Sequence, residues 1–327
     1  MDIVLGVEGD GEHSNAVLAN SAGTVLGVGA NDDSSDWDQN GIAAAASALR
    51  SCVTEALNAA ELTTSDVEAS VFALAGVDFP VDERRLAGIP EAIGLRGRCR
   101  IVNDSFAALR AGTDQPYGVV IIAGTGSVTA GRNRKGVEYR SLGLGPEFGD
   151  YGSESDVSED ALKAVADAFT GRGPQTELTR LLCEATGCLT VVDLLDGTAR
   201  DRIDSTRFTP LVMEAATAGD PVSRSLLAHA GSMLGATAVH IIRTLGMQDT
   251  AFDLVLARAL FNGGSSDLID ALEACVRPVA PDARFHRLEI APVVGSALLA
   301  LELAGHRAPP GAREMLADAL AKTLATR

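Results

Sequence analysis

A glycine-rich turn that carries two hydroxyl groups, Gly124-Thr-Gly-Ser127, lies near the middle of the chain. The apolar run 117–123 precedes it, and residues 128–132 have the composition of a returning strand. We therefore expect a hairpin with glycines at its tip. Glycine lets the backbone come close to a ligand, so consecutive amides and the two hydroxyls could converge on a phosphate oxygen. By itself, such a turn is also typical of an ordinary hairpin.

A carboxylate suited to proton transfer, Asp104, follows the strand-like run 98–102. An aspartate at the end of a strand that borders a cleft could accept a proton as a general base. The same residue opens the sequence Asp-Ser-Phe-Ala-Ala-Leu, which is typical of a helix start, so Asp104 could equally be the N-cap of that helix. The local sequence leaves both interpretations open.

Further glycine-rich or small-residue segments occur in a fixed order along the chain. They are Gly6-Val-Glu-Gly-Asp-Gly11, Leu74-Ala-Gly-Val77, the loop from Tyr139 to Ser153, and Pro292-Val-Val-Gly-Ser-Ala-Leu-Leu-Ala300. Together with the segment from Asn103 to Ser127, they resemble the N-acetylglucosamine kinase-like family. That family belongs to the group that shares the actin, hexokinase and Hsp70 ATPase fold and includes the BadF/BadG/BcrA/BcrD ATPases.

The resemblance implies an α/β fold of two ribonuclease H-like lobes with a cleft between them. We expect an N-terminal lobe over 1–115 and a C-terminal lobe over 116–296, with the C-terminal helix, about 297–327, returning to the first lobe. The resemblance also implies ATP and Mg²⁺ as cofactors, a small-molecule sugar as substrate, and a homodimer.

The same resemblance implies roles for individual residues. Asp104 would be the catalytic base, and Glu8 would stand where the family has the aspartate that holds hydrated Mg²⁺. The residues implied to bind the nucleotide are Gly9, Gly11, Gly124, Thr125, Gly126, Ser127 and Arg258, and those implied to bind the sugar are Asn103, Gly145 and Asp150. For Asp150, an Asx turn that stabilises the loop is the alternative.

The first glycine loop departs from the family pattern. Asp10 and Glu12 place two negative charges beside the expected polyanion, and His13 stands where the family has a lysine. A contact between like charges at about 4 Å costs on the order of 1 to 4 kcal/mol between water-like and surface-like dielectric. We therefore expect this loop to bind phosphate less well than the family pattern would.

The segment expected at the adenosine end of the nucleotide also departs from the pattern. Leu254-Val-Leu-Ala-Arg-Ala-Leu260 replaces a strand followed by glycines. The side chain of Arg258 could block the nucleotide, or it could reach a phosphate or stack on a base, since a guanidinium suits both contacts.

Three functions are compatible with these residues. The first is a kinase that transfers phosphate from Mg-ATP to a hydroxyl of an amino sugar such as N-acetylglucosamine. The second is a catalytically weakened pseudokinase that binds sugar or nucleotide in a regulatory role. The third, an ATP-driven activator of radical dehydratases, requires cysteines that bridge an iron–sulfur cluster, and we set it aside because no cysteine is suitably placed.

Composition narrows the class of protein. The 327 residues are 46% hydrophobic, with no low-complexity linker, which is enough for two cores. The net charge of −17 predicts no nucleic-acid partner. The N-terminus lacks a basic segment, and we find no run of about eighteen apolar residues, so we expect no membrane partner and a cytoplasmic location. The five scattered cysteines are expected to be buried thiols.

Hydrophobic periodicity predicts the elements that position these residues. We expect helices over 42–59, 222–245 and 312–326. Gly231 and Gly235 in the second helix require a backbone packed closely against it, which would suit a helix that crosses between the lobes. The expected strands are 2–7, 15–20, 24–29, 69–74, 100–102, 119–123, 128–132, 253–257 and 285–290.

Overall fold

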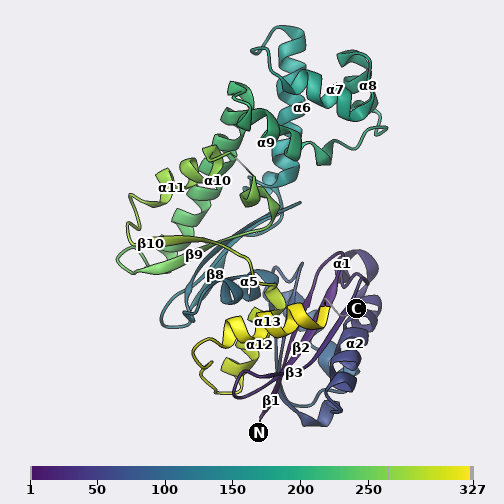
Figure 1. The fold of residues 1–327 in the computed structure, drawn as a ribbon, viewed down its shortest axis with the longest axis vertical. Helices are drawn as coiled ribbons and strands as arrows, with labels where there is room; N and C mark the ends of the chain where they lie inside the picture. The colour runs from purple at the N-terminus through teal and green to yellow at the C-terminus, as the bar shows by residue number, and fades with distance from the viewer. Residues whose placement is uncertain (1, 264, 325–327) are drawn as a thin grey trace. The chain divides into compact units, whose positions relative to one another are not determined.

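A computed structural model of the protein describes residues 2–263 and 265–324. The chain divides into two compact units. The first consists of Met1–Val120 and Leu288–Arg327, and the second of Ile121–Arg287. Each unit is an α/β structure built around one five-stranded sheet (Figure 1).

The sheet of the first unit has the strand order β3-β2-β1-β4-β5. The strands β1, β2 and β3 form an antiparallel meander, while β4 and β5 run parallel to β1. Their bounds are β1 Ile3–Gly9, β2 Ser14–Asn20, β3 Val25–Asn31, β4 Val67–Leu74 and β5 Arg98–Asn103.

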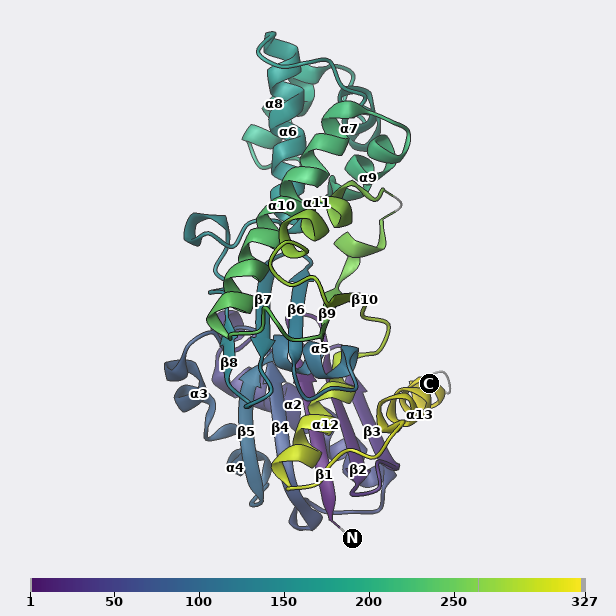
Figure 2. The ribbon, with the colours of Figure 1, turned by 90° about the vertical axis from the view of Figure 1, so that its left-hand side faces the viewer.

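Helices cover both faces of this first sheet (Figure 2). Helix α2 (Ile42–Ala59) lies on the face to which Leu5 and Val7 of β1 point, and the three belong to one buried cluster. On the other face, α5 (Asp104–Gly112) and α12 (Pro292–Leu303) form a second cluster with Val4 and its neighbours. Successive side chains of β1 point to opposite faces of the sheet, so this strand contributes to both cores. The remaining elements of this unit are α1 Trp37–Asn40, η1 Thr64–Asp66, α3 Pro80–Leu86, α4 Ile89–Ile93 and α13 Ala312–Leu324.

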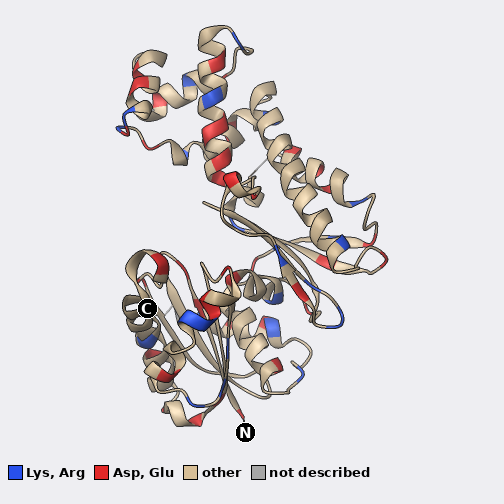
Figure 3. Cartoon of the chain, turned by 180° about the vertical axis from the view of Figure 1, so that it is seen from behind, with Lys and Arg blue, Asp and Glu red and all other residues tan. Residues whose placement is uncertain are grey.

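The sheet of the second unit has the strand order β10-β9-β6-β7-β8. The strands of this sheet are β6 Gly118–Ala123, β7 Ser127–Arg132, β8 Glu138–Arg140, β9 Phe252–Ala257 and β10 Ala283–Arg287. The helices and 3₁₀ turns are η2 Pro146–Phe148, α6 Glu154–Thr170, α7 Leu178–Thr186, α8 Val191–Ala199, η3 Ser205–Arg207, α9 Thr209–Thr217, α10 Pro221–Thr244, η4 Ala259–Asn262 and α11 Asp267–Val276. Acidic residues are spread over both units (Figure 3).

Most of the predicted elements are present, with shifted ends. The helix predicted over 42–59 has those bounds, and the helix predicted over 312–326 is described as far as Leu324, so the rest of it lies outside the described residues. Strand β10 covers 283–287 rather than 285–290, and β8 was not predicted. A three-residue strand carries too short an alternation to be recognised from sequence.

The boundaries between units also differ from the expected ones. The first unit extends to Val120 and takes the chain back at Leu288, whereas the sequence predicted boundaries at 115 and about 297. The second difference arises because α12 packs along its length against α5 and β1, so none of this helix belongs to the second unit.

Helix α10 corrects two expectations. It lies wholly in the second unit, so it does not cross between lobes. The close neighbour that its glycines require is α11: a methyl group on Gly231 would lie 2.0 Å from the carbonyl oxygen of Leu268, and one on Gly235 would lie 2.7 Å from Cβ of Cys275. Among the described residues, α10 is also the one helix long and apolar enough to span a bilayer by length and composition alone, with a mean hydropathy of 1.3, a test that the core helix of a protein without a membrane span passes as well.

Candidate active site

The carboxyl ends of three parallel strands meet at one edge of the first sheet. The register pairs Gly9 with Leu74, and Leu74 with Asn103. Neighbouring strands are about 4.8 Å apart, so β1 and β5, with β4 between them, are separated by roughly 10 Å at this edge. Glu8 and Asp104 are the chain neighbours of these paired residues. The register therefore brings the first glycine loop and the predicted base to the same edge.

The first glycine loop is closed by its own acidic side chain. Oδ1 of Asp10 accepts hydrogen bonds from the amides of Glu12 and His13, both at 2.8 Å, and the Asp10 amide donates to the His13 carbonyl at 3.0 Å. A hydrogen bond with the backbone of Glu12 and the charges of Asp10 and Asp32 raise the pKa of His13, against a smaller effect of burial. A phosphate that used these two amides would first have to displace the Asp10 carboxylate.

The two glycines of this loop differ in what surrounds them. A methyl group on Gly9 would lie 2.1 Å from Oγ of Ser35, so glycine at this position is needed for packing. Ser35 is held there because its amide and hydroxyl both donate to the carbonyl of Asp10. Beside Gly11, by contrast, the space within 4 Å is open. Gly11 is therefore the glycine of this loop whose surroundings leave room for a ligand.

Glu8 is 6% exposed at the end of β1, and its Oε2 accepts a hydrogen bond of 3.0 Å from the side-chain amide of Asn15. Within the described residues, no three His, Cys, Asp or Glu side chains converge to form a metal cage. Mg²⁺ is commonly bound through one or two carboxylates, with waters and substrate phosphates as its other ligands. A single, oriented carboxylate at this edge fits that mode of binding.

The structure separates the roles of Asn103 and Asp104. Asn103 has an extended backbone and is the N-cap of α5, because its side-chain oxygen accepts from the amide of Ser105 at 3.1 Å. The interpretation of Asp104 as the N-cap is therefore wrong: Asp104 is the first residue of the helix and is half-buried. A helix N-terminus stabilises a nearby negative charge by about 0.3–1 kcal/mol. The Asn103 side chain also contacts Asp78, at 3.3 Å.

In the second unit, the predicted hairpin is present, and hydrogen bonds of Gly124 and Ser127, one of them to the carbonyl of Gly126, hold its tip in place. The Gly124 amide donates to the carbonyl of Gly126 at 3.0 Å, and the Gly124 carbonyl accepts from the amide of Glu154 at 2.8 Å. The Ser127 hydroxyl donates to the carbonyl of Asp150 at 3.0 Å. Thr125 and Gly126 are exposed, and the Thr125 hydroxyl has no hydrogen-bond partner in the described part of the chain. Thr125 and Gly126 are therefore the tip residues left to bind a ligand.

The glycine-rich loop after β8 is organised around Asp150, which is 6% exposed. Its Oδ2 accepts from the amides of Gly143 and Leu144, at 2.7 and 3.2 Å. These bonds reach back along the chain, so the side chain does not form the Asx turn that was the alternative, although it does stabilise the loop. The carbonyl of Gly145 accepts from the amide of Asp150 at 3.1 Å. Through Ser127, this loop is fixed to the hairpin.

Arg258 lies against the hairpin of its own unit. A methyl group on Gly124 would come within 3.4 Å of Cγ of Arg258. Burial raises the pKa of Glu154, and the positive charge of Arg258 partly opposes that shift. The backbone of Arg258 has φ 82° and ψ 175°, a region that is essentially confined to glycine and costs another residue about 1–3 kcal/mol. Position 258 therefore keeps a backbone conformation typical of glycine, and its arginine side chain lies beside the turn 124–127.

One group of residues was not anticipated from the sequence. A cavity of about 460 Å³ is lined by Pro210, Met213, Glu214, Thr217 and Ala218 on one side of α9. The segment that follows η4 reaches this helix, because a methyl group on Gly263 would lie 2.6 Å from the sulfur of Met213. No sequence signal points to this cavity, because its lining residues have the spacing of an ordinary packed helix.

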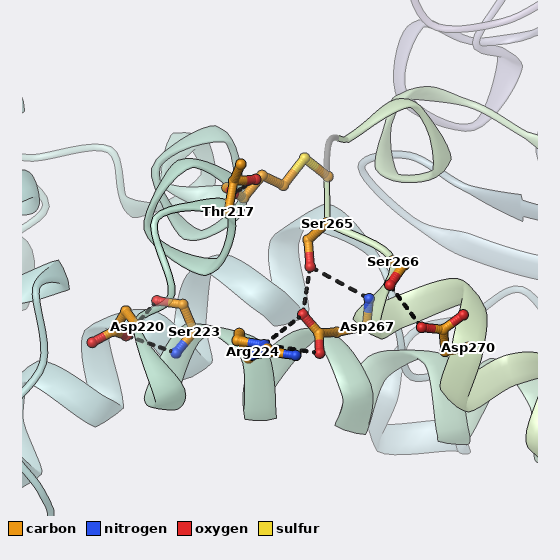
Figure 4. A network of polar contacts seen from close by, with 9 residues as sticks. Thr217, Asp220, Ser223, Arg224, Ser265, Ser266, Asp267 and Asp270 are labelled. Atoms are coloured by element: carbon orange, nitrogen blue, oxygen red, sulfur yellow. Dashed lines mark hydrogen bonds and ion pairs between the residues drawn. The ribbon is translucent and has the colours of Figure 1, made fainter.

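A polar network holds the start of α11 against α10 (Figure 4). Arg224 of α10 donates to both carboxylate oxygens of Asp267, each at 3.1 Å. The Ser265 hydroxyl donates to the same carboxylate, and Ser266 donates to Asp270 at 2.7 Å. The start of α11 is thereby fixed to α10.

Comparison with known proteins identifies the family. The pattern of the BadF/BadG/BcrA/BcrD ATPase family matches residues 5–300. The chain belongs to this family. The N-acetyl-D-glucosamine kinase of Dictyostelium discoideum is 30% identical to it over 318 residues, which cover 92% of this chain and 98% of that protein.

Solved structures agree with this BadF/BadG/BcrA/BcrD assignment. A candidate N-acetylglucosamine kinase from Chromobacterium violaceum superposes with a TM-score of 0.68 at 25% identity, covering 92% of this chain and 99% of that one. The ROK hexokinase of Thermus thermophilus superposes with a TM-score of 0.58 at 18% identity, covering 93% and 99%, and shows the fold alone. The predicted fold of the actin and hexokinase type is confirmed.

The cysteines of this BadF/BadG/BcrA/BcrD family member are less buried than predicted. Cys52 is buried, and burial raises the pKa of its thiol to about 12. Cys99 is exposed, and Cys183, Cys188 and Cys275 are partly exposed. The prediction of buried thiols is therefore wrong for these four: Cys99 lies on the edge strand β5, Cys188 lies in the connection between α7 and α8, and Cys183 and Cys275 lie on helices without being fully buried.

Proposed function

We propose that the protein is an ATP-dependent kinase that transfers the γ-phosphoryl group of Mg-ATP to a hydroxyl of an amino sugar, such as N-acetylglucosamine. The observation that carries this proposal is the register of the first sheet, which places Asp104 at the same edge as the first glycine loop. The Dictyostelium discoideum relative, which matches nearly the whole chain, supports the amino-sugar class. The ATPase family supports the nucleotide.

In this reaction the oxygen of the sugar hydroxyl would bond to the γ-phosphorus while the bond between that phosphorus and the ADP oxygen breaks. Asp104 would accept the proton that the sugar hydroxyl loses. The Thr125 hydroxyl and the amides of Thr125 and Gly126 would bind phosphate oxygens, and the guanidinium of Arg258 would add positive charge beside them. Glu8 would orient Mg²⁺ through its water ligands, and bound Mg²⁺ would neutralise the phosphate charge.

The proposal extends to the sites for the nucleoside and the sugar. We propose that the cavity beside α9 takes the nucleoside end of ATP, because the segment that follows β9 and Arg258 packs against this helix. Asn103, Gly145 and Asp150 would position the sugar, the last two through the loop that Asp150 stabilises. A homodimer and a cytoplasmic location are proposed on the same family resemblance.

Calorimetric titration tests the proposed kinase. The protein is titrated with Mg-ATP with and without N-acetylglucosamine, N-acetylmannosamine and glucose, and ADP release is measured for each sugar. We expect the productive sugar to tighten nucleotide binding and to be consumed with one ADP formed per sugar. Binding of Mg-ATP that no sugar changes, with no ADP released, would contradict the kinase.

A pseudokinase is the second candidate, because the Asp10 carboxylate already occupies two amides of the first loop. The double variant Asp10→Gly, Glu12→Thr frees these amides and removes two charges. In a pseudokinase we expect it to bind Mg-ATP at least roughly tenfold more tightly, which equals about 1.4 kcal/mol, while the parent protein shows no turnover. Turnover in the parent, with no gain of affinity in the variant, would exclude the pseudokinase.

A further inference from the structure

A cavity in the first unit is bordered by three arginines. Its volume is about 650 Å³, and Arg110, Arg307 and Arg313 line it together with Asp114 and Leu298. The cavity lies among the end of α5, the middle of α12 and the start of α13. It is separate from the candidate active site, because Asp104 begins α5 and the cavity lies at the other end of that helix.

The three arginines are bonded to different extents. Arg110 is 6% exposed; its Nε donates to Glu302 at 2.7 Å and its Nη1 to the carbonyl of Thr113 at 2.8 Å. These bonds hold the guanidinium rigidly. Nη2 of Arg110 makes no hydrogen bond with the described residues. One edge of a fixed guanidinium is therefore left for a ligand.

Arg313 and Arg307 complete the set. Arg313 donates from Nη2 to Glu314 at 2.7 Å and from Nη1 to the carbonyl of Ala111 at 3.4 Å. Its Nε is buried and lies 3.1 Å from Oδ1 of Asp114, yet this nitrogen has no hydrogen bond of acceptable geometry with any described residue. The side chain of Asp114 is 65% exposed, so this carboxylate is easily displaced. Arg307 is exposed and has neither an ion pair nor a hydrogen bond in the part of the chain that is described.

This concentration of guanidinium groups is unusual for the chain. The protein carries a net charge of −17, and such a surface repels anions over most of its area. Glu302, Asp114 and Glu314 pair with two of these arginines, Arg110 and Arg313. The donors left over are Nη2 of Arg110, Nε of Arg313 and the whole guanidinium of Arg307, and a phosphate monoester presents three terminal oxygens and a double charge to them. The volume lies within the range of pockets that hold a small metabolite.

We propose that this cavity is a binding site for a small phosphate monoester, with the phosphate held by Arg110, Arg307 and Arg313 and the organic group lying toward Leu298. The ligand displaces Asp114 from Arg313. This proposal concerns the first unit alone and does not depend on the proposed kinase function.

The test uses the full chain and isothermal calorimetry at fixed ionic strength, with glucose 6-phosphate and inorganic phosphate as probes. Arg307→Gln should weaken glucose 6-phosphate binding at least roughly fivefold, since it removes one of three guanidiniums from a divalent anion. Asp114→Asn should strengthen binding several-fold, because it removes the competing carboxylate. Arg96→Gln is the matched control: Arg96 is also exposed in the first unit, without an ion pair among the described residues, and it does not line the cavity.

Three outcomes would overturn the proposal. One is an equal loss of affinity for glucose 6-phosphate in Arg307→Gln and Arg96→Gln, which would mean that the anion responds to the charge of the whole surface and not to this cavity. Another is loss of binding in Thr125→Val with normal binding in Arg307→Gln, which would place the phosphate at the hairpin of the second unit. The third is equal affinity for inorganic phosphate and glucose 6-phosphate, which would leave an anion site without room for the organic group.

Discussion

At the scale of single residues, the N-terminus of α5 shows how two neighbouring side chains divide two tasks. Asn103 supplies the cap, so the helix does not depend on the side chain of Asp104 for its first hydrogen bonds. An asparagine at position 104 keeps the size and shape of the aspartate, so this replacement should cost the fold little. Stability and chemistry can therefore be tested separately here.

Asp104→Asn should lower kcat by roughly 10²–10⁴-fold, because an amide cannot accept the proton. The melting temperature and the affinity for Mg-ATP should stay close to those of the parent. Asn103→Ala is the complementary control and should cost about 1 kcal/mol of stability through loss of the cap. Full activity in Asp104→Asn would remove this residue from the mechanism.

Two roles remain open for Arg258: its guanidinium either binds the phosphates or blocks the nucleotide, and substitution distinguishes them. If its guanidinium binds phosphate, Arg258→Gly should weaken Mg-ATP binding roughly tenfold, about 1.4 kcal/mol. The same change should raise the melting temperature, since glycine adopts φ 82° without strain of about 1–3 kcal/mol. Titration calorimetry and thermal unfolding measure the two effects.

Arg258→Ala is the matched control for that experiment. It keeps the strained backbone and removes the guanidinium, so it should weaken Mg-ATP binding to the same extent without the gain in melting temperature. Tighter Mg-ATP binding in both variants would mean that Arg258 blocks the nucleotide.

At the scale of elements, the contact between α10 and α11 limits what the second unit tolerates. Gly231 and Gly235 let the two backbones approach, and the ion pair between Arg224 and Asp267 fixes their register. Separating α10 from α11 would therefore break both the close backbone approach and the ion pair.

Gly231→Ala should destabilise the protein, because its methyl group would lie 2.0 Å from the carbonyl oxygen of Leu268. Overpacking of this kind costs about 1–3 kcal/mol, more than the gain in helix propensity of roughly 1 kcal/mol. Chemical denaturation measures the loss. Thr237→Ala on the same helix, where only a bond to the preceding turn is lost, should be nearly neutral. An increase in stability for Gly231→Ala would show that the helices can separate at no cost.

At the scale of the whole molecule, charge dominates the surface. With 44 acidic and 27 basic side chains, the folded protein repels itself more than its expanded, unfolded chain does. Many of the ion pairs are exposed, and such pairs contribute about 0–1 kcal/mol each. When salt screens all charges, the stability lost from these ion pairs should therefore be smaller than the stability gained by weakening the repulsion between acidic side chains.

The melting temperature should rise by a few degrees as NaCl is raised from about 10 to 150 mM, because the Debye length falls from roughly 30 to 8 Å. Differential scanning calorimetry at pH 7 measures this rise. Sucrose at matched osmolality controls for effects of the solute on water. A melting temperature that falls with salt would mean that the ion pairs outweigh the net charge.

The sequence by itself determined the elements and their chemistry. The 3.6-residue period of α2 is a local pattern, and the glycine and hydroxyl content of 124–127 follows from residue types alone. These features were predictable because burial on one face and backbone freedom are properties of a short segment.

Only the tertiary structure decided which of these residues are available for chemistry. Whether Asp10 faces outward or bonds to the amides of Glu12 and His13, and whether Asn103 or Asp104 caps α5, depends on a few ångströms that residue types do not fix. Of the arginines around the cavity in the first unit, Arg110 precedes Arg307 and Arg313 by roughly two hundred residues of sequence. No local pattern records such a meeting, because it results from the packing of α12 and α13 against a sheet formed much earlier in the chain.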